Sequence, residues 1–308
     1  MHLLNKSSNT LIIVNPEANE RRTLSTWKKI KHNFEKYEIP YDVEFTKSRG
    51  DAVNLVSKDK HHKNILSLSG DGGMNAVAEG AMKNTQEKNL GMLAGGTAND
   101  FARIYNPSRD ISKLSSILAN EHTRKIDVGE VNGKYFLAHA SIGFDAETLN
   151  ERNKRHFLKG KLAYYSAVFR ALSKYTSKDI VVKTDKEIVN KKTFMAVISN
   201  IPYYADGIEI APRAKSDDEL LDLFLIEGKS SLSLLLRNLS SINSGKHLNN
   251  LENYHCQIKN LEILSAEKVF LQVDGDLVGE SDYFKFEVAE RKLNILCDIK
   301  FLDNLTHY

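Results

Sequence analysis

The chain has 308 residues, of which 41% are hydrophobic and 27% are charged, and its net charge is +3. This composition is ordinary for a globular protein, and the small net charge gives no support to a nucleic-acid partner. No apolar run is long enough to span a bilayer. The two cysteines, Cys256 and Cys297, lie far apart, and no Cys or His spacing resembles a zinc site. The length suits one large domain or two moderate ones.

Strand and helix patterns alternate through the first 125 residues. Leu11–Val14 is an apolar run that fits a buried strand and is too short for a signal peptide. Apolar residues at helical spacing follow at Trp27, Ile30 and Phe34. The same reasoning predicts strands over 41–45, 65–68 and 90–93, and helices near 52–56 and 77–82. This alternation favours a mostly parallel sheet covered by helices.

Two glycine-rich turns, Ser69–Asn75 and Ala94–Arg103, follow two of these strands. Glycine lets a phosphate approach the backbone at a helix start, and a nearby aspartate suits a metal ion that neutralises phosphates. Ligands bind beyond the carboxyl ends of parallel strands, where both turns are expected. The pair therefore indicates a nucleoside triphosphate site with magnesium. The alternative is that each is a tight turn with a helix cap. Arg103 suits a bidentate contact with a phosphate or an aspartate, or else a surface salt bridge.

The pattern changes near Asp127. Residues 127–136 predict a hairpin with Asn132-Gly133 at its turn, and helical patterns return over 145–176. Short β-rich runs follow over 180–184, 194–199, 221–226, 254–263, 268–273 and 284–288, with a helical stretch near 232–244. These runs favour a second, antiparallel domain.

The ordered set of motifs resembles the diacylglycerol kinase catalytic-domain family, especially its small soluble bacterial lipid kinases. The resemblance extends over nearly the whole chain, and it is most specific in the string Thr97–Arg103. The matching motifs are Asn15-Pro16, Thr46, Ser69–Asn75, Gly96–Arg103, Asp127–Gly129, Ser141–Asp145, Ala211–Asp222 and Asp274–Asp276.

This resemblance implies the fold and its division. The expected architecture is an N-terminal three-layer α/β nucleotide-binding domain followed by a C-terminal antiparallel β-sandwich-like domain. The ATP-binding domain is expected over 1–130, with the tail 292–308 returning to it, and the β-rich lipid-substrate domain over 131–291.

The resemblance also implies the activity, which is transfer of the γ-phosphoryl of ATP to the hydroxyl of diacylglycerol or a related lipid alcohol. The ATP-binding positions are Asn15, Thr46, Gly70, Asp71, Gly72, Gly73, Asn75, Gly96 and Thr97. The catalytic Mg²⁺ would be held through water by Asp71, Asp100 and Asp127. Such a spread set of aspartates is reasonable because magnesium keeps several waters and takes few carboxylates.

Two further sets of residues are implied in the C-terminal half. Asp274 would be the general base, with Asp276 beside it, because a lipid hydroxyl gives up its proton poorly without a nearby carboxylate. A second, structural metal position would fall at Asp218 and the backbone carbonyls of Lys215 and Leu220.

Several positions depart from the family's usual pattern. Ser69 stands where most members have glycine, and Gly73 stands where most have threonine, so one hydroxyl near the phosphates is lost. Ala18-Asn19 replaces the usual Ser-Gly, and Asp276 is one methylene shorter than the usual glutamate. Every aspartate of the expected site is present, so we predict an active kinase.

Contact with a membrane is expected of a lipid kinase. The segment Arg152–Tyr165 mixes five basic residues with Phe157, Leu158 and Leu162, as an interfacial helix would. The alternative is a solvated amphipathic helix packed on its own domain. We therefore expect a cytoplasmic protein, peripheral to the inner face of the membrane, and a homodimer is a further expectation.

Two other functions remain open. One is an NAD kinase-like enzyme that phosphorylates a soluble hydroxyl compound, because that family shares a Gly-Gly-Asp-Gly turn. The other is a catalytically weak regulator that binds ATP and lipid, which the altered Gly73 and Asp276 would favour. The P-loop, the His-Glu-x-x-His helix and the protein-kinase His-Arg-Asp string are absent.

Overall fold

The computed structural model describes residues 8–18, 23–105, 111–154, 160–227 and 253–298. The predicted helix near 232–244 lies outside the described residues, as does the stretch 155–159 of the predicted membrane segment. The chain divides into two compact units. The first comprises Met1–Ile126, Ala205–Gly207 and Arg291–Tyr308, and the second comprises Asp127–Tyr204 and Ile208–Glu290.

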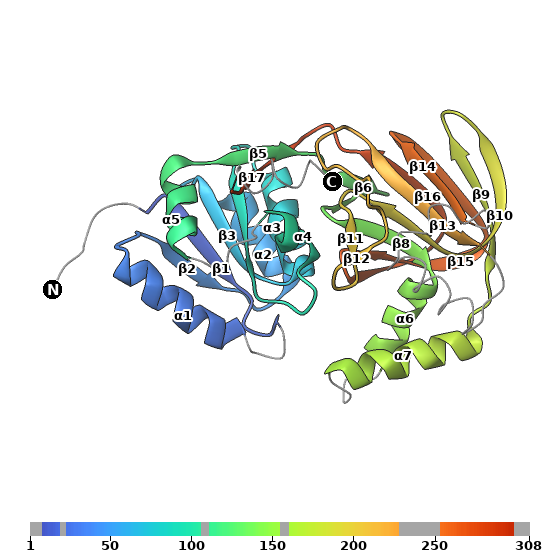
Figure 1. Ribbon diagram of the computed structural model, residues 1–308, viewed down its shortest axis with the longest axis horizontal. Coiled ribbons are helices and arrows are strands. Elements are labelled where there is room, and N and C mark those ends of the chain that lie inside the picture. The colour runs from blue at the N-terminus through green and yellow to red at the C-terminus, as the bar shows by residue number, and fades with distance from the viewer. Residues whose placement is uncertain (1–7, 19–22, 106–110, 155–159, 228–252, 299–308) are drawn as a thin grey trace. The chain divides into compact units, whose positions relative to one another are not determined.

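The first unit is built on a six-stranded sheet in the order β2-β1-β3-β4-β17-β5 (Figure 1). Its strands are β1 (Thr10–Val14), β2 (Asp42–Phe45), β3 (Asn64–Ser69), β4 (Asn89–Ala94), β5 (Thr123–Ile126) and β17 (Leu293–Leu296). All neighbours are parallel except β17 and β5, which pair antiparallel. The central strands β1 and β3 are fully buried because helices cover both faces.

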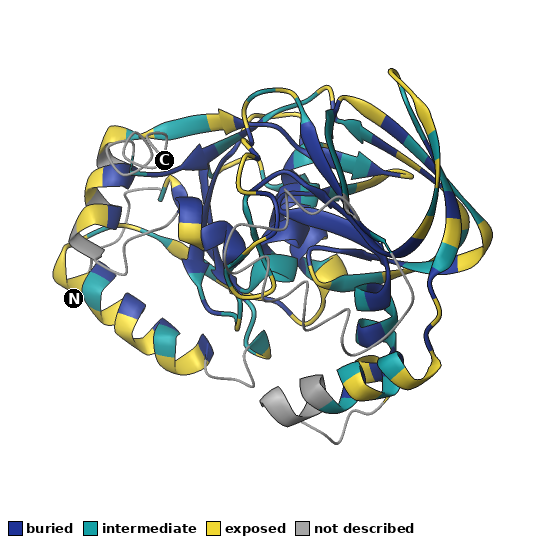
Figure 2. Cartoon of the chain, turned by 45° about the vertical axis from the view of Figure 1, so that its right-hand side comes forward, coloured by how far each residue is buried: buried dark blue, intermediate teal, exposed yellow. Residues whose placement is uncertain are grey.

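Among the described residues, the helices of this unit are α1 (Thr23–Lys36), α2 (Arg49–Lys58), α3 (Asp71–Lys83), α4 (Asp100–Tyr105) and α5 (Ile111–Asn120). α1 and α5 share a core with one face of the sheet, in which Trp27 and Phe34 pack against Ile12 and Leu66. α2 packs on α3, and α3 packs on β3, which gives the third layer (Figure 1). Figure 2 shows the consequence, in which strands are mostly buried and helices keep exposed outer residues.

A cluster of charged side chains links the loop before β3 to the neighbouring residues Asp42 and Lys88. The Nδ1 of His62 lies 2.6 Å from the Oδ2 of Asp59, and its Nε2 lies 2.8 Å from the Oδ2 of Asp42. Asp59 also contacts the buried Lys88 ammonium at 2.9 Å. Burial lowers the pKa of His62, but the two carboxylates outweigh burial, so this pKa is raised above 6.5. The charged imidazolium therefore stabilises the folded chain.

His62→Asn should lower the free energy of unfolding by about 1–2 kcal/mol below pH 6.5, where the wild-type ring is charged. A raised folded-state pKa means that this contribution is complete below the unfolded-state pKa and is lost as pH rises through the folded-state pKa. Urea unfolding of wild type and variant on both sides of that range measures the difference. The control is His61→Asn at the exposed neighbouring position. A His62→Asn effect that grows at alkaline pH would contradict the assignment.

The second unit contains a nine-stranded sheet in the order β14-β13-β10-β8-β15-β16-β6-β7, with β9 paired to both β10 and β15. Its strands are β6 (Gly129–Val131), β7 (Lys134–Phe136), β8 (His139–Gly143), β9 (Lys178–Thr184), β10 (Ile188–Ser199), β13 (Leu221–Glu227), β14 (Asn253–Ile258), β15 (Asn260–Val273) and β16 (Asp276–Val288). β11 (Tyr203–Tyr204) and β12 (Ile208–Glu209) form a separate two-stranded hairpin. Every pairing between the described strands of this unit is antiparallel.

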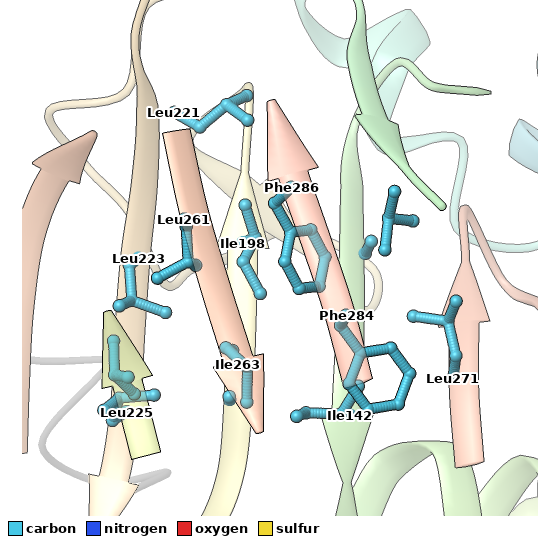
Figure 3. Close-up of a cluster of buried hydrophobic side chains, with 14 of the residues drawn as sticks. Ile142, Ile198, Leu221, Leu223, Leu225, Leu261, Ile263, Leu271, Phe284 and Phe286 are labelled. Carbon is cyan, nitrogen blue, oxygen red and sulfur yellow. The ribbon is translucent and has the colours of Figure 1, made fainter. Parts of the chain in front are cut away.

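The curved sheet encloses a core of aliphatic and aromatic side chains. Figure 3 shows Phe284, Phe286 and Leu271 directed toward Ile142 and Ile198 from neighbouring strands. The opposite face of the sheet packs against α6 (Phe144–Asn153) and α7 (Gly160–Lys174), where Phe144 and Phe194 stack at 4.5 Å.

The predicted fold class is confirmed, with one correction to the strands. The runs predicted over 254–263 and 268–273 are instead β14 and one continuous β15. Residues 264–267, between the two predicted runs, resemble a turn because they include Ser265 and Glu267, but they form an irregularity within the strand. The pairing with β16 shifts register between Leu264 and Val269, as a β-bulge does.

Candidate active site

The two glycine turns lie against each other at the carboxyl ends of β3 and β4. A Cβ on Gly96 would lie 2.3 Å from the Cα of Gly70, and one on Gly70 would lie 3.1 Å from the Cα of Gly96. No side chain fits between the two backbones at this distance. The predicted positions Gly70, Gly72 and Gly73 thus share one edge of the sheet with Gly96, where ligands of open parallel sheets bind.

Asn99 holds the second turn in shape. Its Oδ1 accepts from the N–H of Gly96 at 2.8 Å, and its Nδ2 donates to the carbonyl of Gly96 at 2.9 Å. Asn99 has φ +54°, a left-handed conformation that asparagine adopts more readily than most residues. The N–H of Gly95 donates to the carbonyl of Ser69 at 2.8 Å, which ties the second turn to the end of β3.

Two aspartates begin helices beside these turns. The Oδ1 of Asp71, at the start of α3, accepts from the N–H of Phe101 at 3.0 Å. Asp100 begins α4, and its carboxylate accepts from the N–H groups of Asp206 at 3.2 Å and Gly207 at 2.8 Å. Both carboxylates therefore have fixed positions at the same edge.

The electrostatics of this pair favour a cation. Burial raises the pKa of Asp71, against the opposing effect of backbone N–H groups. Burial, together with the negative charge of Asp71, raises the pKa of Asp100 to about 6. The guanidinium of Arg103 opposes this rise, because its Nε lies 3.4 Å from the Oδ1 of Asp100. The same guanidinium donates to the Oδ1 of Asp206 at 2.6 Å. Arg103 therefore contacts two different aspartates instead of one in a bidentate pair, and its contact with the exposed Asp206 is a surface salt bridge.

These residues fit a hydrated Mg²⁺. A cation beside Asp71 and Asp100 would offset the burial and the negative charge of Asp71 that raise the pKa of Asp100. Within the described residues, no group of three or more His, Cys, Asp or Glu side chains is arranged to hold a metal ion. Two carboxylates nevertheless match an ion that keeps several waters and takes one or two carboxylates with substrate phosphates.

Three other predicted ATP-binding residues follow strands of the same sheet. Asn15 follows β1, where its N–H donates to the carbonyl of Leu68 at 3.1 Å. Thr46 follows β2 and is buried, and its N–H donates to the carbonyl of Val14 at 2.9 Å. Thr97 is exposed in the second turn. All three belong to the carboxyl edge that carries the glycine turns.

Asn75 is almost fully buried in α3. The sequence did not indicate that Arg49 contacts it. Arg49 donates to the Oδ1 of Asn75 at 2.6 Å and pairs with Glu79 at 2.6 Å. Lys83 pairs with the same Glu79 from the other side. No spacing rule reveals the contact between Arg49 and Asn75, because they lie on different helices.

We expect Arg49→Met to raise the KM for ATP about tenfold, which corresponds to about 1.4 kcal/mol. The variant removes the hydrogen bond to the Asn75 Oδ1 and a positive charge next to a predicted ATP-binding residue. Lys83→Met is the matched control, because it removes the other Glu79 partner without touching Asn75. Steady-state kinetics of both variants measure the effect. Equal changes in the two variants would show that Arg49 acts only through Glu79.

In the second unit, Asp127 lies against the segment predicted to hold the structural metal. Its N–H donates to the carbonyl of Ser216 at 2.6 Å, and its Oδ2 accepts from the N–H of Glu219 at 2.7 Å. The Oδ1 of Asp218 accepts from the N–H of Leu220 at 3.1 Å. Burial and the nearby acidic side chains raise the pKa of Asp218, which is the electrostatic setting of a cation site. Lys215 is exposed beside it.

The predicted base lies in the turn between β15 and β16. Asp274 and Gly275 have φ values of +45° and +85°, as the central residues of a type I′ hairpin require. Asp274 is buried, and its carboxylate accepts three backbone N–H bonds, from Leu137 at 2.8 Å, Ala138 at 3.0 Å and His139 at 2.9 Å. Asp276 begins β16 and is partly exposed.

Comparison with known families accounts for both units. Residues 9–131 match the diacylglycerol kinase catalytic domain, and residues 138–297 match the YegS C-terminal NAD kinase beta sandwich-like domain. The diacylglycerol kinases of Staphylococcus saprophyticus and Bacillus subtilis are each 25% identical over 272 residues. Each alignment covers 87% of this chain and 89% of the relative.

Solved structures support the fold. A diacylglycerol kinase from Bacillus anthracis has a TM-score of 0.65 at 20% identity, over 96% of this chain and 99% of that one. An NAD kinase from Archaeoglobus fulgidus in complex with ATP has a TM-score of 0.54 at 12% identity, over 97% of each chain. The chain belongs to the diacylglycerol kinase catalytic-domain family, and it is a kinase that transfers a phosphoryl group to an alcohol acceptor.

Proposed function

We propose that this protein is a magnesium-dependent lipid kinase that transfers the γ-phosphoryl of ATP to the hydroxyl of diacylglycerol or a related lipid alcohol. The observation that carries the proposal is the contact between the two glycine turns, with Asp71 and Asp100 at their edge. Phosphoryl transfer depends chiefly on positioning and on charge neutralisation, and this edge offers backbone N–H groups and a carboxylate pair.

Each part of the site has a proposed task. The Gly70–Gly73 turn and Gly96 let the phosphates approach the backbone, while Asn15, Thr46, Asn75 and Thr97 bind the rest of the nucleotide. Asp71 and Asp100, with Asp127, would hold Mg²⁺ through water. The ion would neutralise charge on the phosphates when bound. Arg103 keeps Asp100 in place through its contact with that carboxylate.

Asp274 is the proposed proton acceptor. Three backbone N–H donors hold its carboxylate in a fixed position. The lipid hydroxyl oxygen forms a bond to the γ-phosphorus as the bond from that phosphorus to the β,γ-bridging oxygen breaks. ADP leaves, and the hydroxyl proton passes to Asp274. Asp276 would assist from the same turn.

A structural metal and a membrane contact complete the proposal. Asp218, with the carbonyls of Lys215 and Leu220, would hold the metal beside Asp127. The segment Arg152–Tyr165 would contact an anionic membrane, and α7 supports this with Phe169, whose exposed fraction is 72%. Among the described helices, none combines the length and hydrophobicity needed to cross a bilayer. A homodimer stays a prediction.

The test is transfer of labelled γ-phosphate from Mg·ATP to a panel of acceptors in mixed micelles. The panel holds diacylglycerol, monoacylglycerol, phosphatidylglycerol and a sphingoid base, with NAD as the soluble acceptor. We expect a labelled lipid, and a kcat that falls about 10²–10⁴-fold in Asp274→Asn because proton transfer is lost. Asp276→Asn, in the same turn, is the matched variant and should lose less.

The other outcomes are distinct. Label on NAD alone would favour the NAD kinase-like alternative, for which the shared fold is the only structural argument. ATP binding without transfer to any acceptor would favour the regulator. Because Asp274 also anchors backbone N–H groups, thermal unfolding of Asp274→Asn is measured in parallel. A variant that unfolds like wild type and keeps the wild-type kcat would remove Asp274 from the mechanism.

A further inference from the structure

One face of the antiparallel sheet carries a buried polar network that is hydrogen-bonded to the Asp274–Asp276 turn. Its centre is Asp145, which lies in the first turn of α6. The Oδ2 of Asp145 accepts hydrogen bonds from the hydroxyls of Ser141 and Tyr204, the latter at 2.6 Å. Gln272 is the remaining member, with its Nε2 at 3.3 Å from the same carboxylate oxygen. All four residues belong to the second unit.

Strand register brings Gln272 into this network. Gln272 of β15 and Ser141 of β8 are direct partners in an antiparallel pair, so their side chains leave the same face of the sheet. The Nε2 of Gln272 donates to the Oγ of Ser141 at 2.7 Å. Gln272 is 3% exposed and Ser141 is fully buried. The orientation of the Gln272 amide is therefore fixed by its donor end.

The acceptor end of the same amide contacts the backbone of the Asp274–Asp276 turn. The Oε1 of Gln272 accepts from the N–H of Gly275 at 2.8 Å. Gly275 and Asp274 are the two left-handed residues of the hairpin, and the N–H of Asp274 donates to the carbonyl of His139 at 2.9 Å. His139 contacts the ring of Tyr204 with centroids 4.6 Å apart. A chain of hydrogen bonds thus runs from Asp145 through Gln272 to the backbone of the turn.

The charges make this arrangement specific to an amide at position 272. Burial raises the pKa of Asp145, and the bonds from Ser141, Tyr204 and Gln272 oppose that rise. A carboxylate at position 272 would face Asp145 without a donor, and a hydrocarbon there would remove the acceptor of the Gly275 N–H. Only a side chain with one donor end and one acceptor end satisfies both neighbours.

We propose that Gln272 is a positioning residue for phosphoryl transfer, which aligns the Asp274–Asp276 turn by linking the N–H of Gly275 to the Asp145 carboxylate. The inference rests on the proposed function, because it assumes that this turn serves the acceptor hydroxyl. Gln272 itself touches no reacting atom, so its removal acts through the position of Asp274. A misplacement of about 1 Å at a reacting group can cost about 100-fold in rate.

The test compares four proteins. Gln272→Met keeps the length of the side chain and removes both ends of the amide. Gln272→Glu places a carboxylate against Asp145. The double variant Asp145→Asn/Gln272→Glu exchanges the two groups, so that one amide and one carboxylate remain and the net charge is unchanged. Gln257→Met is the matched control, because Gln257 lies in the same sheet and contacts Asp222 at 3.4 Å.

For Gln272→Met and Gln272→Glu we expect kcat to fall about 10- to 100-fold with the KM for ATP unchanged. The exchanged double variant should recover about tenfold or more of the Gln272→Glu loss, and Gln257→Met should match wild type. Amide hydrogen exchange in the 272–276 turn should accelerate in Gln272→Met, because the Gly275 N–H loses its acceptor.

The outcomes separate this inference from the proposed function. Unchanged hydrogen exchange in the turn of Gln272→Met would overturn the positioning role, whatever the activity. A wild-type kcat in Gln272→Met, or no recovery in the double variant, would also overturn it, provided that Asp274→Asn is impaired. If wild type labels no acceptor, or if Asp274→Asn keeps the wild-type kcat, the proposed function fails, and the positioning role in catalysis fails with it.

Discussion

Gly96→Ala is expected to abolish phosphoryl transfer and to lower the free energy of unfolding by about 1–3 kcal/mol. The added Cβ would lie 2.3 Å from the Cα of Gly70 and 2.9 Å from the Oδ1 of Asn99. Neither neighbour is the end of a flexible chain, because one is backbone and the other is held by two hydrogen bonds. The two turns must separate, and the edge that we assign to the phosphates changes shape.

The matched control for this variant is Gly50→Ala, which adds the same methyl group in the first turn of α2. The nearest atom to a Cβ at Gly50 is the Oγ of Ser48 at 3.9 Å, which is ordinary contact. Alanine in a helix is favoured over glycine by about 0.5–1 kcal/mol, so this variant should be at least as stable as wild type. Unfolding in urea and transfer assays on both variants measure the contrast. An active Gly96→Ala protein would contradict the close packing of the turns.

Gly73→Thr, which installs the family's usual residue, is expected to damage this protein rather than improve it. A Cβ at Gly73 would lie 2.5 Å from both the Cβ and the Oγ of Ser69. Ser69→Gly removes both of those atoms. The double variant therefore carries the usual glycine and threonine of the family, and it should recover stability and transfer that Gly73→Thr alone has lost.

A double-mutant cycle measures this coupling. Ser69→Gly alone should cost about 1 kcal/mol, because it removes a hydrogen bond of 2.7 Å between the Ser69 and Ser67 hydroxyls. We expect a coupling energy of about 2–3 kcal/mol between positions 69 and 73 in urea unfolding. Additive effects of the two substitutions would contradict the steric coupling between positions 69 and 73.

The same pair explains why single departures from a family pattern mislead when each is taken alone. The sequence suggested that Gly73 had lost a hydroxyl near the phosphates. In the structure, the serine at position 69 fills the space that a side chain at position 73 would need. Positions 69 and 73 are neighbours in space, and the sequence alone does not show their distance.

Much of the fold could be predicted because it depends on local patterns. β1 and β3 are buried along their whole length and contain the apolar runs Leu11–Val14 and Ile65-Leu66, and the Asn132-Gly133 hairpin has the positive φ values that its sequence favours. β15 was harder, because exposed polar residues within a strand resemble a turn in sequence. Periodicity cannot distinguish a bulge from a loop when the partner strand is unknown.

The candidate site divides in the same way. Glycines and aspartates at strand ends were visible in the sequence because each motif is contiguous. The contacts that orient them were not, because Arg49 reaches Asn75 from another helix and Gln272 meets Ser141 across 131 positions of chain. Such partners follow from register and helix packing, which a single sequence does not specify.

The most direct test of the kinase account is the transfer of labelled γ-phosphate from ATP to diacylglycerol, with Mg²⁺ or with a chelator, by wild type, Gly50→Ala and Gly96→Ala. The account predicts labelled lipid from wild type and Gly50→Ala in Mg²⁺, and none with chelator or from Gly96→Ala. Labelled lipid from Gly96→Ala at the wild-type rate, or none from a folded wild-type protein that binds ATP, would contradict it.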